Sequence, residues 1–572
     1  MLMAQRYKRW QIGSRLSLEA ERALQNYPPL LRQILFNRGF VTNELAYQYI
    51  AAALPDGTQG KRLAGIAQAV ERISWALRRG EQIIVYGDYD ADGVTASALL
   101  VQTLGRFGVQ VRGYIPNRFD EGYGLNKDAL HQLKDEEAGL VITVDCGVRS
   151  IEEAEYARSI GLDLIITDHH HPGAELPDCV ALVNPKQPKD DYPDKDLAGV
   201  GLAFKLASAL LEDCGQHLTE QLELSELLDL VAVGTVADLT PLKGENRALV
   251  RAGLQSIRNP RRQGLLSLIG TAGLRPDRIT ASQIAFAIGP RLNAAGRLDS
   301  ALAAFQLLTT QDVVEAGQIA QQLEIQNRER QQITREIQAA AERIALEKDT
   351  DALLLFAAHE EFNAGVVGLA ASRLCDHYHR PAIVASKGPT HTRGSCRSIT
   401  EFHITAALDQ CSDLLERYGG HAAAAGFTVS NENLPMLIER LGALAIEQLA
   451  DKDLRPVLVA DVEVPLRELR PDLLEYLEWL QPTGYGNPEP YFVSRDVQVK
   501  NSRQVGKENS HLKLTLIEGG IIHDAIAFGQ GQRHEEMPGR VDIMYTYEKN
   551  EFNGRESLQL RIRDLKPAGT PD

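Results

Sequence analysis

The sequence contains few cysteines, and no two of them are close enough together to suggest a metal-binding or redox pair. The six cysteines stand far apart in the 572 residues, at Cys146, Cys179, Cys214, Cys375, Cys396 and Cys411. Structural zinc sites and redox dithiols need closely spaced cysteines, and disulfide-stapled domains are far richer in cysteine. We therefore expect reduced thiols and a cytoplasmic protein.

The sequence also has no apolar run that approaches the roughly 20 residues of a membrane span. Residues 1–10 lack the apolar core of a signal peptide, so we expect no membrane association. The composition, with 44% hydrophobic and 24% charged residues, is that of an ordinary globular protein. At 572 residues, the chain is too long for a single core and predicts about three or four domains.

Positive charge is in short supply as well. The 61 Lys and Arg residues are outnumbered by 77 Asp and Glu residues, which gives a net charge of −16, and no long Lys/Arg run occurs. An acidic chain repels a phosphate backbone at long range, so nucleic-acid binding requires a local basic groove. Composition neither supports nor excludes such a groove.

The most informative stretch is an apolar strand that runs into three carboxylates. Residues 83–86 are followed by Asp88, Asp90 and Asp92, and then by Gly93, where a helix can begin. Alternate side chains of an extended backbone lie on one side, so the three carboxylates can converge. Such like charges repel unless a cation lies among them, and oxygen ligands select magnesium, manganese or calcium over zinc. This pattern predicts a divalent-metal site.

A calcium-binding EF-hand loop also opens with this spacing of carboxylates. That loop requires a glutamate at its twelfth position, where this sequence has Leu99. An EF-hand loop also follows a helix, whereas residues 83–86 have the character of a strand. Both features argue against the EF-hand.

From about residue 80, short apolar strands alternate with helical stretches, a pattern typical of a parallel sheet. Polar residues follow the apolar runs 140–144, 164–167 and 227–236, namely Asp145, Asp168, His169, His170 and Asp238. A single aspartate after a strand is more often a helix cap than a ligand. The carboxyl ends of parallel strands share one edge, however, so we expect these side chains to converge with the first three carboxylates. They suffice for two ions that share a carboxylate, an arrangement suited to attack on phosphorus.

In their order along the chain, these motifs resemble the DHH phosphoesterase superfamily. Two further stretches, Ile115–Leu125 and Gly289–Arg297, resemble its RecJ branch of single-strand-specific 5′→3′ exonucleases. The resemblance extends from about residue 80 to about residue 565. It implies an α/β protein in which a parallel-sheet DHH domain (51–310) is joined by a long helix (311–348) to an α/β DHHA1 domain (349–450). A small β-barrel of the OB-fold (451–568) follows, and residues 1–50 form an N-terminal helical segment.

The resemblance also assigns roles at the proposed centre. Two Mn²⁺ or Mg²⁺ ions are expected, with Asp145 as the bridging ligand. His170 is expected to stabilise the scissile phosphate or protonate the leaving oxygen, and Asp168 to orient an imidazole. The expected metal ligands are Asp88, Asp90, Asp92, Asp145, His169 and Asp238, and the expected catalytic group is Asp145, His169, His170 and Asp168.

Two glycine-rich stretches, Gly394–Ser398 and Gly419–His421, resemble the part of a DHHA1 domain that holds the nucleic-acid backbone. Glycine permits close approach and arginine suits phosphate, although each stretch alone is as typical of a turn. The expected substrate-binding residues are Arg118, Asn293, Arg297, Ser395, Arg397, Ser398 and His421. The sequence departs from the family at Phe362-Asn363, where Trp-His is usual.

Residues 311–348 contain no proline and, after Gly317, no glycine, and the sequence predicts a helix of roughly 50 Å there. From about 455 the sequence is rich in short strands, which fits a small barrel. Most of its aromatic residues are better explained as barrel core than as stacking platforms.

Three other functions use parts of the same pattern. A DHH phosphodiesterase acting on short oligonucleotides or pyrophosphate-like molecules needs no C-terminal barrel. A non-catalytic replication scaffold would lack ligands, and a binding-only single-strand protein would not need them. We expect single-stranded DNA as substrate, a single-strand-binding protein and a helicase as partners, and a monomer.

Overall fold

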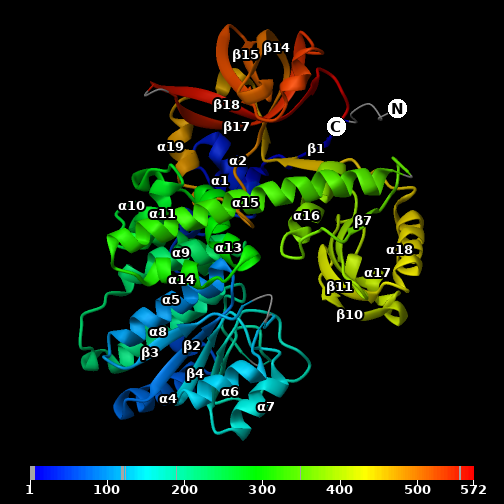
Figure 1. Ribbon diagram of the computed structural model, residues 1–572. Helices are drawn as coiled ribbons and strands as arrows, with labels where there is room; N and C mark the ends of the chain where they lie inside the picture. The colour runs from blue at the N-terminus through cyan, green and yellow to red at the C-terminus, as the bar shows by residue number, and fades with distance from the viewer. Residues whose placement is uncertain (1–6, 118–120, 123, 189, 348, 553–554) are drawn as a thin grey trace. The chain divides into compact units, whose positions relative to one another are not determined.

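The computed structural model describes residues 7–572 except 118–120, 123, 189, 348 and 553–554. The chain forms two compact units (Figure 1). The first comprises residues 1–55, 241–248 and 455–572, and the second comprises residues 56–240 and 249–454.

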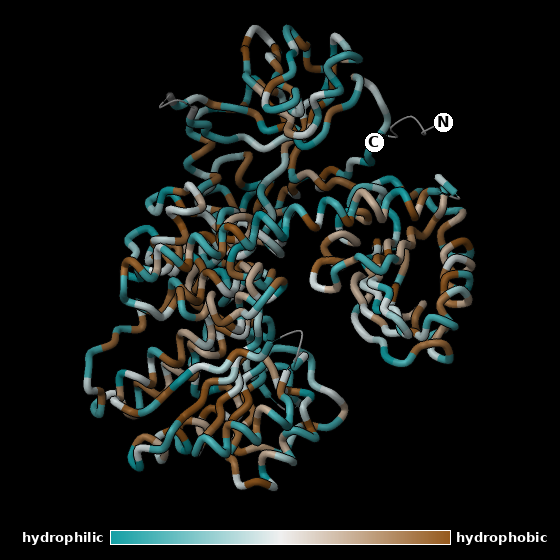
Figure 2. The backbone as a smooth tube through the Cα atoms, in the orientation of Figure 1, coloured by the Kyte–Doolittle hydropathy of each residue, from teal (hydrophilic) through white to brown (hydrophobic). Residues whose placement is uncertain are grey.

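The second unit begins with a parallel sheet of strand order β3-β2-β4-β5-β6. Its strands are almost entirely apolar because helices cover both faces of such a sheet, and Figure 2 shows them in brown. The strands are β2 (Gln82–Gly87), β3 (Val111–Tyr114), β4 (Ala138–Val144), β5 (Asp163–Thr167) and β6 (Ala181–Val183). The helices are α4 (Ile66–Arg79), α5 (Ala91–Gly105), α6 (Lys127–Asp135), α7 (Ile151–Ser159) and α8 (Gly199–Cys214). This arrangement confirms the predicted parallel-sheet domain.

A helical region follows the sheet. It contains α9 (Leu228–Ala237), α10 (Gly244–Arg258), α11 (Gln263–Thr271), α12 (Ala281–Gln283), a π-helical turn (Ile284–Ile288), α13 (Gly289–Leu298) and α14 (Leu302–Thr309). Our grouping of residues 227–236 with the strands was wrong, because they form α9. This helix is buried on all sides, so its sequence has no amphipathic period that would separate it from a buried strand.

The long predicted helix is α15 (Val313–Leu346). Its 34 residues extend for about 51 Å at 1.5 Å per residue. The helix contacts α11, α13 and α14 on one side of the unit, and α16 and β7 on the other. It therefore connects the parallel-sheet domain to the next domain.

That next domain is built on a five-stranded mixed sheet of order β10-β11-β9-β8-β7. The strands are β7 (Leu355–His359), β8 (Ala382–Lys387), β9 (His391–Arg397), β10 (Leu415–Gly420) and β11 (Ala424–Ser430), and the helices are α16 (Val367–Tyr378), α17 (Ile404–Asp409) and α18 (Leu434–Leu449). A single core of apolar residues from the sheet, α16 and α18 includes Ile337 and Ala341 of α15.

The first unit contains a closed barrel of five strands, β14-β15-β16-β18-β17, in which β14 also pairs with β17. The barrel strands are β14 (Phe492–Val505), β15 (His511–Glu518), β16 (Ile521–Ala527), β17 (Arg540–Phe552) and β18 (Arg555–Pro567), and β13 (Val462–Glu463) adds to β14. The predicted small barrel is confirmed. A separate pair is formed by β1 (Arg9–Ile12) and β12 (Val457–Ala460), which run parallel.

The N-terminal residues belong to this barrel unit rather than forming a segment of their own. Helices α1 (Leu18–Ala23), α2 (Pro29–Asn37), α3 (Asn43–Ala51) and α19 (Leu473–Glu478) accompany the barrel. Leu31, Ile34 and Leu35 share one core with Leu514 and Ile543 of the barrel. The segment was expected to be helical, but its described part also contains the strand β1, because the distant strand β12 supplies a pairing partner.

Candidate metal centre

The first three carboxylates lie at the junction of β2 and α5. Asp90 is the N-cap of α5, and its Oδ1 accepts hydrogen bonds from the backbone amides of Asp92 (2.8 Å) and Gly93 (3.1 Å). A Cβ at Gly93 would lie 2.5 Å from the carbonyl oxygen of Asp88, so only glycine permits this tight turn. The local fold therefore holds the carboxylates at the edge of the sheet.

Asp92, in the first turn of α5, is fully buried. It lies against the N-terminus of a second helix, α8. Its carboxylate accepts hydrogen bonds from the backbone amides of Gly199 (2.7 Å) and Val200 (2.8 Å). These amides belong to the first turn of α8 and carry the positive end of its dipole. The glycine is required, because a Cβ at Gly199 would lie 2.7 Å from the Cβ of Asp145.

Asp145 follows β4 and has a left-handed backbone conformation, with φ of 63°. Such a conformation is uncommon for residues other than glycine and clusters at functional sites. The residue is 1% exposed, and its backbone amide donates to the carbonyl of Thr167 at 3.0 Å. The turn thus directs a buried carboxylate into the cluster.

His169 and Asp238 complete the cluster. The Nε2 of His169 lies 3.1 Å from Asp145 Oδ1, 3.6 Å from Asp238 Oδ2 and 4.0 Å from Asp92 Oδ2. Asp238 comes from the C-terminal end of α9, since that run is a helix and not a strand. One of the candidate ligands that meet at the sheet edge, Asp238, is therefore positioned by a helix and not by a strand.

The described residues include three groups that are able to hold a metal ion, each with candidate ligand atoms within 4.8 Å of one another. They are Asp88, Asp90 and Asp145; Asp92, His169 and Asp238; and Asp145, His169 and His170. Asp145 belongs to the first and third groups and lies beside His169 of the second. The geometry brings together all six residues predicted as ligands, with Asp145 between two sets.

The electrostatics of the cluster favour a cation. Burial, together with the negative charge of Asp90, raises the pKa of Asp92 to about 7. Burial and neighbouring carboxylates raise the pKa of Asp238 to about 9 and hold that of Asp145 well above its ordinary value. The pKa of His169 is lowered to about 3, chiefly by burial, so the ring is neutral and able to act as a ligand. Buried oxygen atoms with a neutral imidazole fit Mg²⁺ or Mn²⁺.

His170 and Asp168 form a pair beside the ligands. Asp168 Oδ1 accepts hydrogen bonds from the backbone amide of His170 (3.0 Å) and from its ring Nδ1 (2.7 Å), and Asp168 Oδ2 accepts from the amide of Val148 (2.9 Å). Burial opposes protonation of His170, but the hydrogen bond to Asp168 and nearby carboxylates outweigh it and raise the pKa above 6.5. The contact places Asp168 where it orients this imidazole.

The predicted substrate-binding residues do not form a single contact set. Asn293 Oδ1 accepts from the backbone amide of Ala91 at 2.7 Å, so this side chain braces the turn that carries Asp90. Arg297 of α13 donates from Nη1 to the carbonyl of Gly365 at 3.3 Å. Arg118 lies outside the described residues.

Of the remaining four predicted residues, two lie on strand β9 of the mixed sheet and two directly follow its strands β9 and β10. Arg397 and Ser395 are on β9 beside Gly368 of α16: a Cβ at that glycine would lie 3.3 Å from Arg397 Nη2 and 3.4 Å from Ser395 Oγ. Ser398 Oγ donates to the carbonyl of Phe402 at 2.6 Å, so its hydroxyl proton is already engaged. His421 follows β10.

Comparison with known proteins agrees with these domains. Residues 82–235 match the DHH family, N-terminal domain; residues 349–447 match the DHHA1 domain; and residues 460–564 match the RecJ OB domain. The single-stranded-DNA-specific exonuclease RecJ of Escherichia coli K12 is 36% identical over 565 residues, which cover 94% of this chain and 96% of that protein. The chain belongs to the RecJ family.

Other RecJ proteins are also similar to this chain over most of its length. RecJ of Bacillus subtilis strain 168 is 38% identical over 542 residues, covering 94% of this chain and 68% of that protein. The structure of RecJ from Thermus thermophilus in complex with Mn²⁺ superposes with a TM-score of 0.84 at 32% identity, covering 99% of this chain and 80% of that one. A second structure of the same protein is a complex with Mg²⁺, with a TM-score of 0.78 at 30% identity, covering 99% and 79% of the two chains.

Sequence reasoning missed two supports of this RecJ centre. The Nζ of Lys186 donates to the carbonyl of His169 at 2.6 Å, and Nδ2 of Asn184 donates to that of His170 at 2.8 Å. Both residues follow β6 at the same sheet edge, so the rule that found Asp145 would have found them. None of the helices that the structure describes is long and apolar enough to cross a membrane.

Proposed function

We propose that this chain hydrolyses single-stranded DNA from the 5′ end, releases 5′-nucleotides, and serves DNA repair and recombination. The observation that carries the proposal is the position of Asp145 between two sets of buried ligands in a chain of the RecJ family. The two sets would hold two Mn²⁺ or Mg²⁺ ions. When bound, these ions lower the pKa of water and neutralise charge that develops on a phosphate.

Two sets of side chains would each hold one of the two ions. Asp88 and Asp90 with Asp145 would hold one ion, and Asp92, His169 and Asp238 would hold the other, with Asp145 shared between them. The turn at Gly93 and the amides of α8 fix these side chains before substrate arrives. Little reorganisation is then needed during the reaction, which is how preorganised sites accelerate chemistry.

His170 acts on the phosphate or on the leaving oxygen. With Nδ1–H donating to Asp168, Nε2 carries a proton only in the imidazolium form, and that is the proton the ring would give away. Because the pKa of His170 is raised, the imidazolium form extends toward neutral pH. The ring can stabilise negative charge or protonate the departing oxygen.

Strand polarity requires an asymmetric element, because two metal ions on a phosphodiester do not distinguish its two ends. Arg397 and Ser395 on β9, with Ser398, His421 and Arg297, are the proposed phosphate contacts, and Arg118 is a further candidate. The pKa of Arg397 is lowered by burial, and a partly buried guanidinium gains from binding an anion.

The closed barrel is proposed to bind single-stranded DNA, as OB-folds do. A single-strand-binding protein and a helicase are the proposed partners, the cytoplasm is the proposed location, and the proposed state is a monomer.

Digestion of matched single and double strands labelled at either end tests the proposal. With Mn²⁺ present, a 5′-labelled single strand should release labelled mononucleotide at once, whereas a 3′-labelled strand should shorten gradually. Equal attack on duplex, or early release of the 3′ label, would contradict it. Activity confined to very short oligonucleotides would favour the small-substrate phosphodiesterase instead.

A further inference from the structure

We propose that a groove along α15 is a docking site for a helical segment of a partner protein, one whose apolar face is flanked by lysine or arginine. The groove lies between α15 and the turn that follows β7, and its volume is about 750 Å³. Its lining contains none of the metal ligands and none of the predicted DNA contacts. The proposal therefore does not depend on the proposed function.

The floor of the groove is an apolar stripe on one face of α15. Its members recur at intervals of four, three and four residues, as one face of a helix requires. They are Ile333, Ile337, Ala340 and Ile344, and Phe362 joins them from the opposite wall. Ile344 is 36% exposed, whereas Ile337 and Phe362 are each 5% exposed. The stripe extends for about 16 Å at 1.5 Å per residue, which matches about three turns of a second helix.

Both walls of the groove are fixed by contacts within the chain. Glu342 of α15 accepts a hydrogen bond from the hydroxyl of Tyr378 of α16, which anchors the first wall. In the second wall, the backbone amide of Glu361 donates to Nδ1 of His359 at 3.2 Å. The rings of His359 and Phe362 lie 5.5 Å apart. Because the groove is preformed, little free energy is lost in ordering it when a ligand binds.

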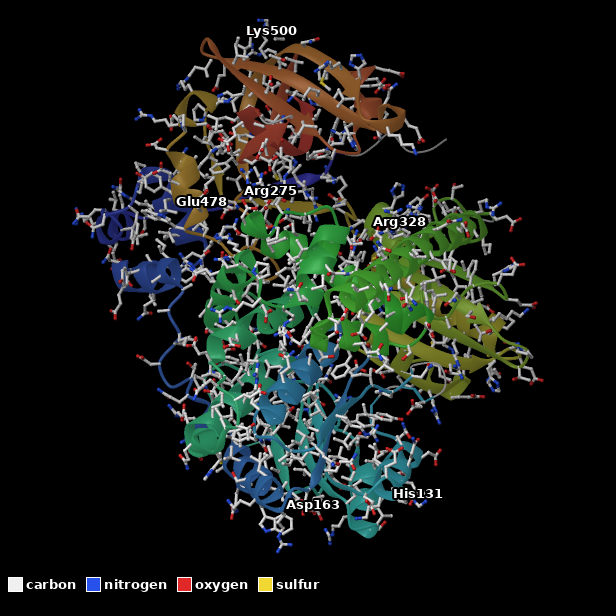
Figure 3. All side chains as sticks on the ribbon, turned by 60° about the vertical axis from the view of Figure 1, so that its left-hand side comes forward. His131, Asp163, Arg275, Arg328, Glu478 and Lys500 are labelled. Carbon is white, nitrogen blue, oxygen red and sulfur yellow. The ribbon has the colours of Figure 1, made fainter. Side chains whose placement is uncertain are left out.

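The rim of the groove is acidic. The charged side chains of the lining are one arginine, Arg343, and three glutamates, Glu336, Glu347 and Glu361. All four are exposed, and within the described ranges none of them forms an ion pair. By contrast, Arg328 on the same helix, labelled in Figure 3, pairs with Glu324 at 2.6 Å. Carboxylates that surround an apolar floor complement a ligand with positive charges beside its apolar face.

These charges argue against nucleic acid as the occupant. The three glutamates would repel phosphates, in a chain whose net charge is already −16. An apolar stripe at helical spacing is matched instead by the side-chain ridges of another helix, and helices that bind in grooves use apolar anchors at the same intervals. A basic amphipathic helix supplies both the apolar anchors and the cations.

The test uses a fluorescent peptide of about 16 residues, in which leucines recur at these intervals and lysines lie beside them. A peptide of the same composition in scrambled order controls for charge alone. Protein is added at about 0.15 M salt, and binding is followed by fluorescence anisotropy. We expect the scrambled peptide to bind at least about tenfold more weakly, because it does not place its leucines on one helical face.

A pair of substitutions locates the apolar contact. Ile344→Gln should weaken binding of the ordered peptide about tenfold, because an amide replaces an apolar side chain in the floor of the groove. Met436→Gln is the matched control, since Met436 is an apolar residue of α18 in the same domain and is 56% exposed. This control should bind as wild type does. Thermal unfolding checks that both variants are folded.

A second pair tests the acidic rim. Glu336→Lys/Glu361→Lys should weaken binding at least about tenfold, because it removes two carboxylates beside the floor and adds two like charges. Glu439→Lys/Glu447→Lys makes the same change of net charge at exposed positions of α18. Affinity should stay near wild type in this control, because its substitutions lie outside the groove.

Several results would overturn the proposal. They are equal binding of the two peptides, no binding of the ordered peptide up to about 100 μM, or equal effects of the groove variants and their α18 controls. Weaker binding of single-stranded DNA by Ile344→Gln would assign the groove to nucleic acid. A wild-type dimer that Ile344→Gln dissociates would make the occupant a second copy of this chain. Either result would also overturn the proposal.

Discussion

Replacing Asp145 by asparagine should abolish hydrolysis and leave the fold intact. The substitution keeps the size of the side chain but removes a buried negative charge that lies 3.1 Å from His169 Nε2 and within ligand distance of Asp88 and Asp90. Both ions would lose a ligand, so we expect the rate to fall by about three orders of magnitude or more. The assay is release of labelled nucleotide from a 5′-labelled single strand with Mn²⁺.

The same substitution, which lowers activity, should raise the stability of the metal-free protein at neutral and alkaline pH. The pKa of Asp92 rises from 3.8 to about 7, which corresponds to roughly 4 kcal/mol at about 1.4 kcal/mol per pKa unit. A carboxyl group whose pKa is raised on folding stabilises the folded state below its unfolded pKa, and this contribution is lost as pH rises through the folded value. Asp145 adds to the same loss, because burial and the neighbouring carboxylates hold its own pKa well above the ordinary value, and asparagine has no carboxyl group to ionise.

The metal-free wild type should therefore lose stability between about pH 4 and pH 9, the range set by the pKa values of Asp92 and Asp238. Asp145→Asn should flatten that loss, and Mn²⁺ should raise its Tm less than that of wild type. Thermal unfolding at about pH 6 and about pH 8.5, with and without Mn²⁺, checks both expectations. Near-normal turnover by a well-folded Asp145→Asn protein would refute the reasoning.

Three further predictions follow from the same centre and the same fold. Chelator should remove activity, and Mn²⁺ or Mg²⁺ should restore it. Zn²⁺ should restore it poorly, because the ligands include no thiolate. Activity that resists chelator would be incompatible with a metal centre. Asp168→Asn should lower the pKa of His170, so the alkaline fall in kcat should move to lower pH. A pH–rate profile measures this shift, and an unmoved profile would mean that His170 is not the titrating acid. Arg397→Ala should lower kcat/KM on single strands by the equivalent of about 1–3 kcal/mol, the loss of one phosphate contact, while the Mn²⁺ affinity measured by calorimetry stays unchanged. Joint loss of both would mean that Arg397 is not a phosphate contact separate from the metal centre.

Much of the metal centre could be predicted because it obeys a local rule. Asp90, Asp145 and His169 each lie within three residues of the end of an apolar strand, and parallel strands end at one edge of their sheet. Asp238 was found by the same rule, after the apolar run 227–236, but that run is the helix α9 and not a strand. Apart from Asp229 and Thr235, residues 227–236 are apolar, and such a run does not distinguish a buried helix from a buried strand.

The contacts made over long sequence distances could not be predicted. Leu31 and Ile34 pack with barrel residues such as Leu514, yet nothing in the N-terminal sequence specifies that partner. Arg247 illustrates the same point: its Nη2 donates to the carbonyl oxygens of Trp479 (3.1 Å) and Gln481 (2.9 Å), which ties residues 241–248 to the barrel unit. Burial and partner choice at such sites depend on tertiary packing and not on local pattern.

The central claim is that two ions share Asp145. Calorimetric titration of the metal-free wild-type protein with Mn²⁺ at neutral pH tests it most directly. The account predicts two ions bound per chain, with both affinities reduced in Asp145→Asn. A single ion per wild-type chain, or a second ion whose binding survives the substitution unchanged, would contradict the account.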